Sequence, residues 1–99
     1  MKKDLIDEIG IDAEGRLYVK PRASTFPLIY REGMDVHWDD DNAFLYGPPP
    51  RRWSYIQWYR QIISAAAAQG VNLKPHPETI WPNIPEGLRD EIDERNQNA

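Results

Sequence analysis

The 99-residue sequence contains no cysteine, two histidines and no apolar run long enough to span a membrane. Without cysteine the chain can form neither a disulfide nor a thiolate metal site. A membrane helix needs about 20 consecutive apolar residues. Residues 1–3 resemble the start of a signal peptide, but Asp4 and Asp7 follow where such a peptide requires an apolar segment. We therefore expect a soluble, cytoplasmic protein that does not associate with membranes.

Familiar catalytic and metal-binding motifs are missing as well. The sequence has no nucleophile elbow, no H-E-x-x-H and no glycine-rich phosphate loop. His37 and His76 lie in unrelated segments with no spacing that indicates a catalytic pair. The run Asp39–Asp41 does not match an EF-hand loop, because Phe44 and Pro50 stand where Gly and Glu are required. The sequence thus indicates no catalytic residue, no metal site and no cofactor.

Acidic side chains outnumber basic ones, and the excess lies in the first half of the chain. The formal net charge is −4; residues 1–50 hold ten acidic and six basic side chains, and residues 51–99 hold six of each. Binding to nucleic acid requires a basic footprint. We expect no nucleic-acid partner, and an acidic first half is better suited to a protein partner with a basic surface.

The length fits one domain, which we assign to residues 1–95, with residues 96–99 expected to be disordered. One stretch dominates it, a helical pattern over residues 54–69. Ser54 is a favourable N-cap, and the aromatic residues Trp53 and Trp58 occupy the positions of a hydrophobic staple. Gly70 supplies the left-handed residue that commonly ends a helix.

The apolar arc of this helix is wide, about 200° when residues are placed at 100° steps. A surface helix needs an apolar stripe of little more than 100°. The proline-rich tail, with its own Trp81, is one candidate for covering the excess within a monomer. A second copy is the other, and we predict a two-fold homodimer with Trp53, Trp58, Ala65 and Trp81 near its interface.

Strand patterns precede the helix, and proline punctuates the chain after it. The first nine residues fit either a helical turn or a strand. Residues 12–15 read as a hairpin turn. Alternating or β-rich segments follow at residues 16–20, 26–31, 34–38 and 43–47. We predict an α+β fold: a small antiparallel meander of three to five strands, the long helix packed on one face, and a proline-rich tail that wraps the surface and ends in a short helix from Pro85 to about Glu94.

Five residues are candidates for contact with a partner, because Trp and Arg dominate the energetics of protein interfaces: Arg51, Arg52, Trp53, Trp58 and Trp81. A structural alternative is open for each. The tryptophans before and within the helix can simply staple its start, the arginines can bind carboxylates of the sheet, and Trp81 can plug the open side of the helix.

Two functional hypotheses follow. The first is a non-catalytic protein-interaction module, such as an inhibitor or immunity-like factor, that binds a basic partner through an acidic sheet or an aromatic surface. The second is a small-molecule-binding protein or enzyme with a pocket between helix and sheet. The residues expected to line that pocket are Tyr18, Trp38, Tyr46, Tyr59 and Arg60, with Arg51 as an alternative cation.

Overall fold

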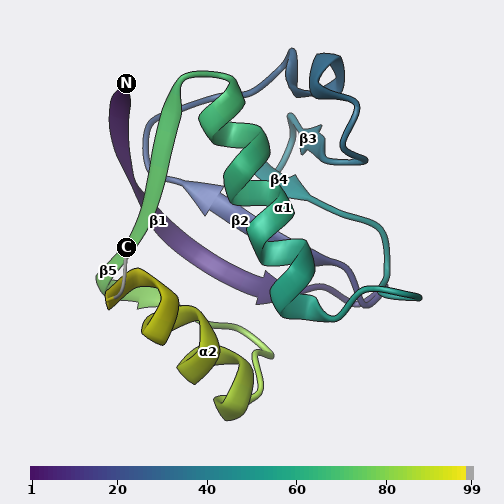
Figure 1. The fold of residues 1–99 in the computed structure, drawn as a ribbon, viewed down its shortest axis with the longest axis vertical. Coiled ribbons are helices and arrows are strands. Elements are labelled where there is room, and N and C mark those ends of the chain that lie inside the picture. The colour runs from purple at the N-terminus through teal and green to yellow at the C-terminus, as the bar shows by residue number, and fades with distance from the viewer. Residues whose placement is uncertain (98–99) are drawn as a thin grey trace.

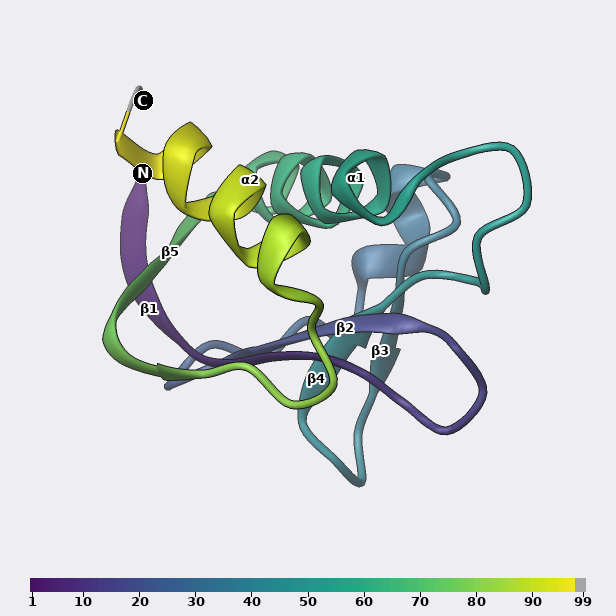
Figure 2. The same cartoon turned by 90° about the horizontal axis from the view of Figure 1, so that it is seen from below.

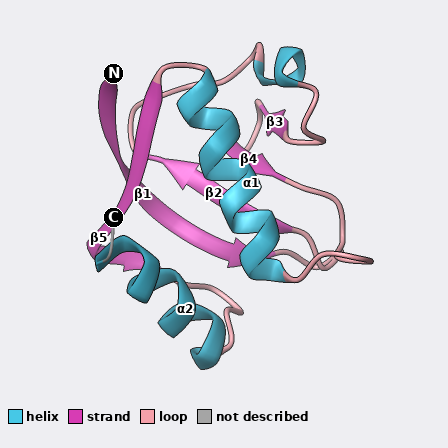
Figure 3. Cartoon of the chain, in the orientation of Figure 1, coloured by secondary structure: helices cyan, strands magenta, loops and turns pink. Residues whose placement is uncertain are grey.

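The computed structural model describes residues 1–97, and within them a mixed five-stranded sheet carries two α-helices on one face (Figures 1 and 2). The predicted α+β class is confirmed, and Figure 3 separates its helices from its strands. The elements in chain order are β1 (Lys2–Ile11), β2 (Leu17–Pro21), the 3-10 turn η1 (Ile29–Glu32), β3 (His37–Asp39), β4 (Phe44–Tyr46), α1 (Tyr55–Ala68), β5 (Val71–Ile80) and α2 (Glu86–Gln97).

The strands lie in the order β3-β4-β2-β1-β5. The first four strands of the chain pair antiparallel, but not as the predicted meander, because β2 pairs with β4 and places β3 at the edge of the sheet. The fifth strand, β5, runs parallel to β1, so the sheet is mixed and not purely antiparallel. A parallel neighbour requires the chain to cross over the sheet between the two strands. Helix α1 makes that crossing, which fixes it against one face of the sheet (Figure 1).

The prediction for the segment after α1 was wrong, because residues 71–80 form an edge strand and do not merely wrap the surface. Their pairing with β1 runs from Val71 opposite Lys2 to Ile80 opposite Glu8, with a register shift after Ile6. Pro75 is tolerated because a strand at the edge of a sheet can lack a ladder N–H. Where the register shifts, the Thr79 hydroxyl donates to the Ile6 carbonyl at 2.6 Å.

Two predicted strands also required correction. Residues 26–31 contain no strand; Phe26 and Ile29 are both buried, and their spacing of three matches the tight turn that leads into η1. The strand predicted over residues 34–38 is reduced to β3, because Asp35 has a left-handed backbone with φ of 58° and interrupts the extended path. The undecided N-terminal residues form a strand, β1, which has 10 residues and lies between β2 and β5.

Both predicted ends of α1 are confirmed. The Ser54 backbone N–H donates to Gln57 Oε1 at 2.7 Å, while the Gln57 backbone N–H donates to the Ser54 hydroxyl at 3.5 Å, which completes a capping box. Gly70, with φ of 86°, ends the helix as expected. Helix α2 begins at Glu86, one residue after the predicted start at Pro85, and continues to Gln97, beyond the predicted end near Glu94. The expected disorder of residues 96–99 stays a prediction, since 98 and 99 lie outside the described residues.

The face of α1 that meets the sheet is fully packed. Ile62 is completely buried, and Leu88 and Ile92 of α2 join the same core. Ile63, the next residue along the helix, is only partly buried and packs at the edge of this core. The side chains of α1 that are buried are Trp58, Tyr59, Ile62, Ala65 and Ala66.

Truncation of these two neighbouring isoleucines distinguishes the core from its edge. Ile62→Ala should lower the free energy of unfolding by about 3 kcal/mol, because it leaves a cavity in a packed core. Ile63→Ala removes the same atoms from a partly exposed site and should have an effect of about 1 kcal/mol. Urea denaturation followed by circular dichroism measures both; equal effects would contradict the described packing.

The Asp4 carboxylate holds the chain where it leaves β2. Its Oδ2 accepts hydrogen bonds from the backbone N–H groups of Ser24 at 2.8 Å and Ala23 at 3.1 Å, and Oδ1 accepts from that of Leu5 at 2.9 Å. Burial alone would raise the pKa of Asp4, but the backbone hydrogen bonds of Ser24, Ala23 and Leu5 and the Ser24 side chain outweigh it and lower the pKa below its usual 3.8.

Because the pKa of Asp4 is lower in the folded than in the unfolded chain, its stabilisation is present above the unfolded value and is lost as the pH falls through the folded value. Asp4→Asn should therefore destabilise the protein by about 0.5–1 kcal/mol at neutral pH and flatten the loss of stability below about pH 4. Thermal unfolding of both proteins across that range provides the measurement. Parallel pH profiles for the two proteins would show that Asp4 does not carry this role.

Candidate functional site

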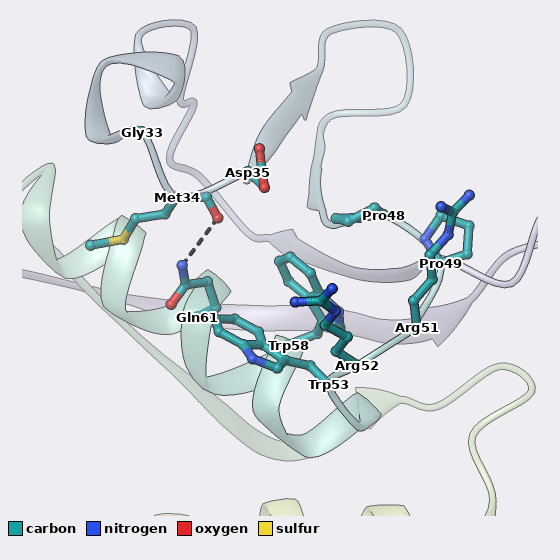
Figure 4. A pocket seen from close by; sticks show the side chains of 10 residues that line it. All are labelled: Gly33, Met34, Asp35, Pro48, Pro49, Arg51, Arg52, Trp53, Trp58 and Gln61. Carbon is teal, nitrogen blue, oxygen red and sulfur yellow. Dashed lines mark hydrogen bonds between the residues drawn. The ribbon is translucent and has the colours of Figure 1, made fainter.

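Four of the five predicted contact residues line one pocket at the start of α1, which we call the α1 pocket (Figure 4). Its volume is about 480 Å³, within the range of sites that hold small ligands or side chains. The residues that line it are Gly33, Met34, Asp35, Pro48, Pro49, Arg51, Arg52, Trp53, Trp58 and Gln61.

The two tryptophans form the predicted staple, with ring centroids 4.9 Å apart. Trp58 is 9% exposed and packs against Gly47, where a Cβ atom would lie 2.8 Å from the Trp58 ring carbon Cε3. Any larger residue at position 47 would therefore displace this ring. Trp53 is 40% exposed, so one indole completes the core while the other presents an aromatic face to solvent.

The opposite wall comes from the segment between η1 and β3 (Figure 4). Gly33 and Asp35 both adopt left-handed backbone conformations, which turn Met34 toward the helix. Gln61 of α1 donates from Nε2 to the Met34 carbonyl at 3.1 Å and holds the wall at this distance. No local pattern in the sequence indicates these residues, since Met34 and Gln61 are 27 positions apart and meet only in the folded chain.

The charges of the pocket are not balanced. Arg51 and Arg52 are exposed, and neither forms an ion pair with any of the described residues. Asp35 is the single acidic side chain among the lining residues and lies on the other wall (Figure 4). The alternative in which these arginines bind carboxylates of the sheet is thus not what the structure shows. Two guanidinium groups beside an exposed indole are available to an anion.

The fifth predicted contact residue, Trp81, lies elsewhere. It sits between β5 and α2, is partly buried and packs against the core. The Arg89 guanidinium carbon lies 5.0 Å from the centre of its ring, within range of a cation–π contact. Trp81 therefore packs on the core beside α2. The alternative that it plugs the open side of α1 stays a prediction.

The residues expected to line a pocket between helix and sheet do not converge on one cavity in the described structure. Tyr18 and Tyr46 are register partners. Their strand neighbours Leu17, Val19 and Leu45 belong to the core, so alternation along the strands turns both tyrosines to the face that carries no helix. Tyr59 is buried in the core, Trp38 packs edge-on against Phe26, and Arg60 is exposed on the outer side of α1. The space between α1 and the sheet is filled by side chains.

On the helix-free face, Tyr18 stacks on Phe44 with centroids 4.6 Å apart, and the Arg16 guanidinium lies 4.4 Å from the centre of the Tyr46 ring. The Tyr18 hydroxyl donates to a carboxylate oxygen of Glu8. Burial, then this hydrogen bond and the negative charge of Glu8, raise the pKa of Tyr18 far above its usual value. Tyr18 is therefore a fixed neutral donor in the sheet.

The remaining sequence candidates give no site among the described residues. No cluster of three His, Asp or Glu side chains is placed to hold a metal there. Asp39 instead accepts hydrogen bonds from the backbone N–H groups of Asp41 and Asn42. The acidic residues 39–41 therefore belong to a turn that is held by its own hydrogen bonds. None of the described helices combines the length and apolar character needed to cross a membrane.

The architecture places the chain among small α+β domains with a mixed sheet. The model of the family "Integron Cassette Protein Hfx_Cass5" matches residues 4–76, and the chain belongs to this family. It is similar to a solved structure from the mobile metagenome of North West Arm Sewage Outfall, titled "Integron Cassette Protein Hfx_Cass5": the two are 45% identical, the match covers 98% of each chain, and the TM-score is 0.51. Among curated proteins none matches the chain.

Replacing Trp53 tests whether its role is structural alone. Because its indole is partly exposed and its main contact is one aromatic pair, Trp53→Ala should lower the free energy of unfolding by only about 1 kcal/mol. Trp58→Ala should lower it by about 3–5 kcal/mol, since that ring is buried. Denaturation curves of the two variants provide the comparison. Losses of equal size would mean that Trp53 belongs to the core and is not available to a partner.

Proposed function

We propose that the protein is a non-catalytic binding module whose α1 pocket receives an anionic group of a partner protein. One observation carries the proposal: Arg51 and Arg52 flank the exposed Trp53 without an ion-pair partner among the described residues. In a chain of net charge −4, arginines have many carboxylates available, so leaving two unpaired in one pocket is consistent with binding. A planar guanidinium binds a carboxylate through two parallel hydrogen bonds.

Contact with a basic partner through the acidic sheet has less support. Asp4, Asp12 and Asp39 each accept several hydrogen bonds from their own chain. The net charge still favours such a partner at long range, and an inhibitor or immunity-like role stays a hypothesis. A small anionic ligand is the second candidate, and the volume of the α1 pocket favours it. Such a ligand would bind at the start of α1, because core side chains fill the space between helix and sheet.

A two-fold homodimer also stays a prediction. Its original basis was the surplus of apolar surface on α1, and much of that surface is buried against the sheet and against Leu88 and Ile92 of α2. Trp53, directly before the N-cap of this helix, is the interface candidate that still exposes a large aromatic surface. Solubility and a cytoplasmic location likewise stay predictions.

Charge reversal at the pocket tests the proposed function. Arg51→Glu/Arg52→Glu should weaken capture of a specific partner from host lysate by more than about tenfold, because it replaces two attractive contacts with repulsion. The matched control is Lys3→Glu/Lys74→Glu, which changes the net charge equally at exposed positions outside the pocket. Quantitative mass spectrometry of captured proteins measures the ratio. Equal losses with both double variants would indicate a general charge effect and refute the pocket as the binding site.

A further inference from the structure

A second hollow adjoins the α1 pocket on the outer side of the helix. Its volume is about 250 Å³, and its lining residues are Trp53, Gln57, Arg60, Gln61 and Ser64. Trp53 and Gln61 line both hollows, so the exposed indole stands between them. The second hollow carries its own cation, Arg60, which is exposed and has no ion pair with any residue that the structure describes.

The hollows extend along the helix. Gln57, Arg60 and Ser64 follow one another at spacings of three and four, which places them on one outward stripe of α1. At 1.5 Å per residue, the stripe from Gln57 to Ser64 is about 10 Å long. The α1 pocket continues this path beyond the start of the helix, toward Pro48 and Pro49.

We propose that the two hollows form one groove, and that the groove binds an extended acidic segment of a partner protein. An apolar side chain of the segment packs on Trp53, and acidic side chains before and after it pair with Arg51 and Arg52 on one side and with Arg60 on the other. This inference rests on the proposed function of the α1 pocket and adds the class of its ligand. The charge complementarity supports it: three unpaired arginines occur within ten positions of a net acidic chain.

The shape and charge favour a peptide over other anions. An extended chain rises about 3.3 Å per residue, so about three residues span the stripe on α1 and a few more reach into the pocket. A small anion would occupy one hollow and leave the other cation unused. Nucleic acid is disfavoured by the net charge of −4. Asp35, on the far wall of the pocket, repels carboxylates and so directs them toward Arg51 and Arg52.

The test is a titration of the isotope-labelled protein with a blocked five-residue peptide that has two glutamates on each side of a leucine. The NMR signals of the Trp53 indole N–H and of the Nε–H groups of Arg51, Arg52 and Arg60 should shift together. The matched peptide with lysines in place of glutamates should leave them unchanged. Arg60→Gln should weaken the peptide about threefold, whereas Arg31→Gln, exposed and outside both hollows, should have no effect.

One further variant should act in the opposite direction. Asp35→Asn removes the negative charge of the far wall, and asparagine tolerates the left-handed backbone of this position. We expect it to tighten binding of the acidic peptide about twofold to threefold. An unchanged or weaker affinity of this variant would contradict the placement of the carboxylates in the groove.

The outcomes separate this inference from the proposed function. Shifts at Arg51, Arg52 and Trp53 without Arg60 would overturn the extended groove and leave the anion-binding pocket intact. Shifts of equal size with inorganic phosphate would show that the ligand is a small anion and would overturn the peptide as its class. Tighter binding of a single-stranded oligonucleotide would overturn the choice of a protein segment. Absence of any shift at all three arginines, together with unimpaired capture by Arg51→Glu/Arg52→Glu, would overturn both.

Discussion

The parallel pairing of β5 with β1 is the constraint on which the arrangement of the molecule depends. Two strands that lie side by side and run the same way cannot be joined by a short turn, so the intervening chain must cross a face of the sheet. Helix α1 makes that crossing and fills the face with Ile62 and its neighbours. Its first turn consequently lies near the segment that connects η1 with β3, and this proximity creates the α1 pocket (Figures 1 and 4).

The two tryptophans at the start of α1 differ in exposure, and we propose that one has a structural role and the other a binding role. Trp58 is buried against Gly47 and holds the helix to the sheet. Trp53 packs against it from outside with its ring tilted, which holds its indole without burying it. A rigid aromatic surface loses little conformational entropy on binding, and neighbouring arginines add direction to the contact. The structural alternative for this pair is therefore correct but incomplete, since stapling the helix leaves one ring and two arginines exposed.

The sequence predicted well whatever depends on local chemistry. Both ends of α1 followed from Ser54 and Gly70, and the position of the candidate surface followed from the composition of residues 51–58. The sequence-based predictions were wrong where pairing between distant strands overrides the local preference of the residues. The prolines of residues 75–77 argued against a strand, yet the edge of the sheet tolerates them and β1 supplies a partner. The far wall of the α1 pocket could not be predicted from the sequence either, because Met34 and Gln61 meet only after the chain has folded.

We propose that the unpaired arginines around Trp53 bind an anionic partner by ionic contacts. The most direct test is the salt dependence of the affinity for the acidic peptide, followed through the Trp53 indole signal. If three exposed ion pairs form, raising the ionic strength from about 50 mM to about 500 mM should weaken binding by about tenfold, because screening acts on exposed charges. An affinity that is unchanged or increases with salt would show that apolar contact alone drives binding and would contradict this account.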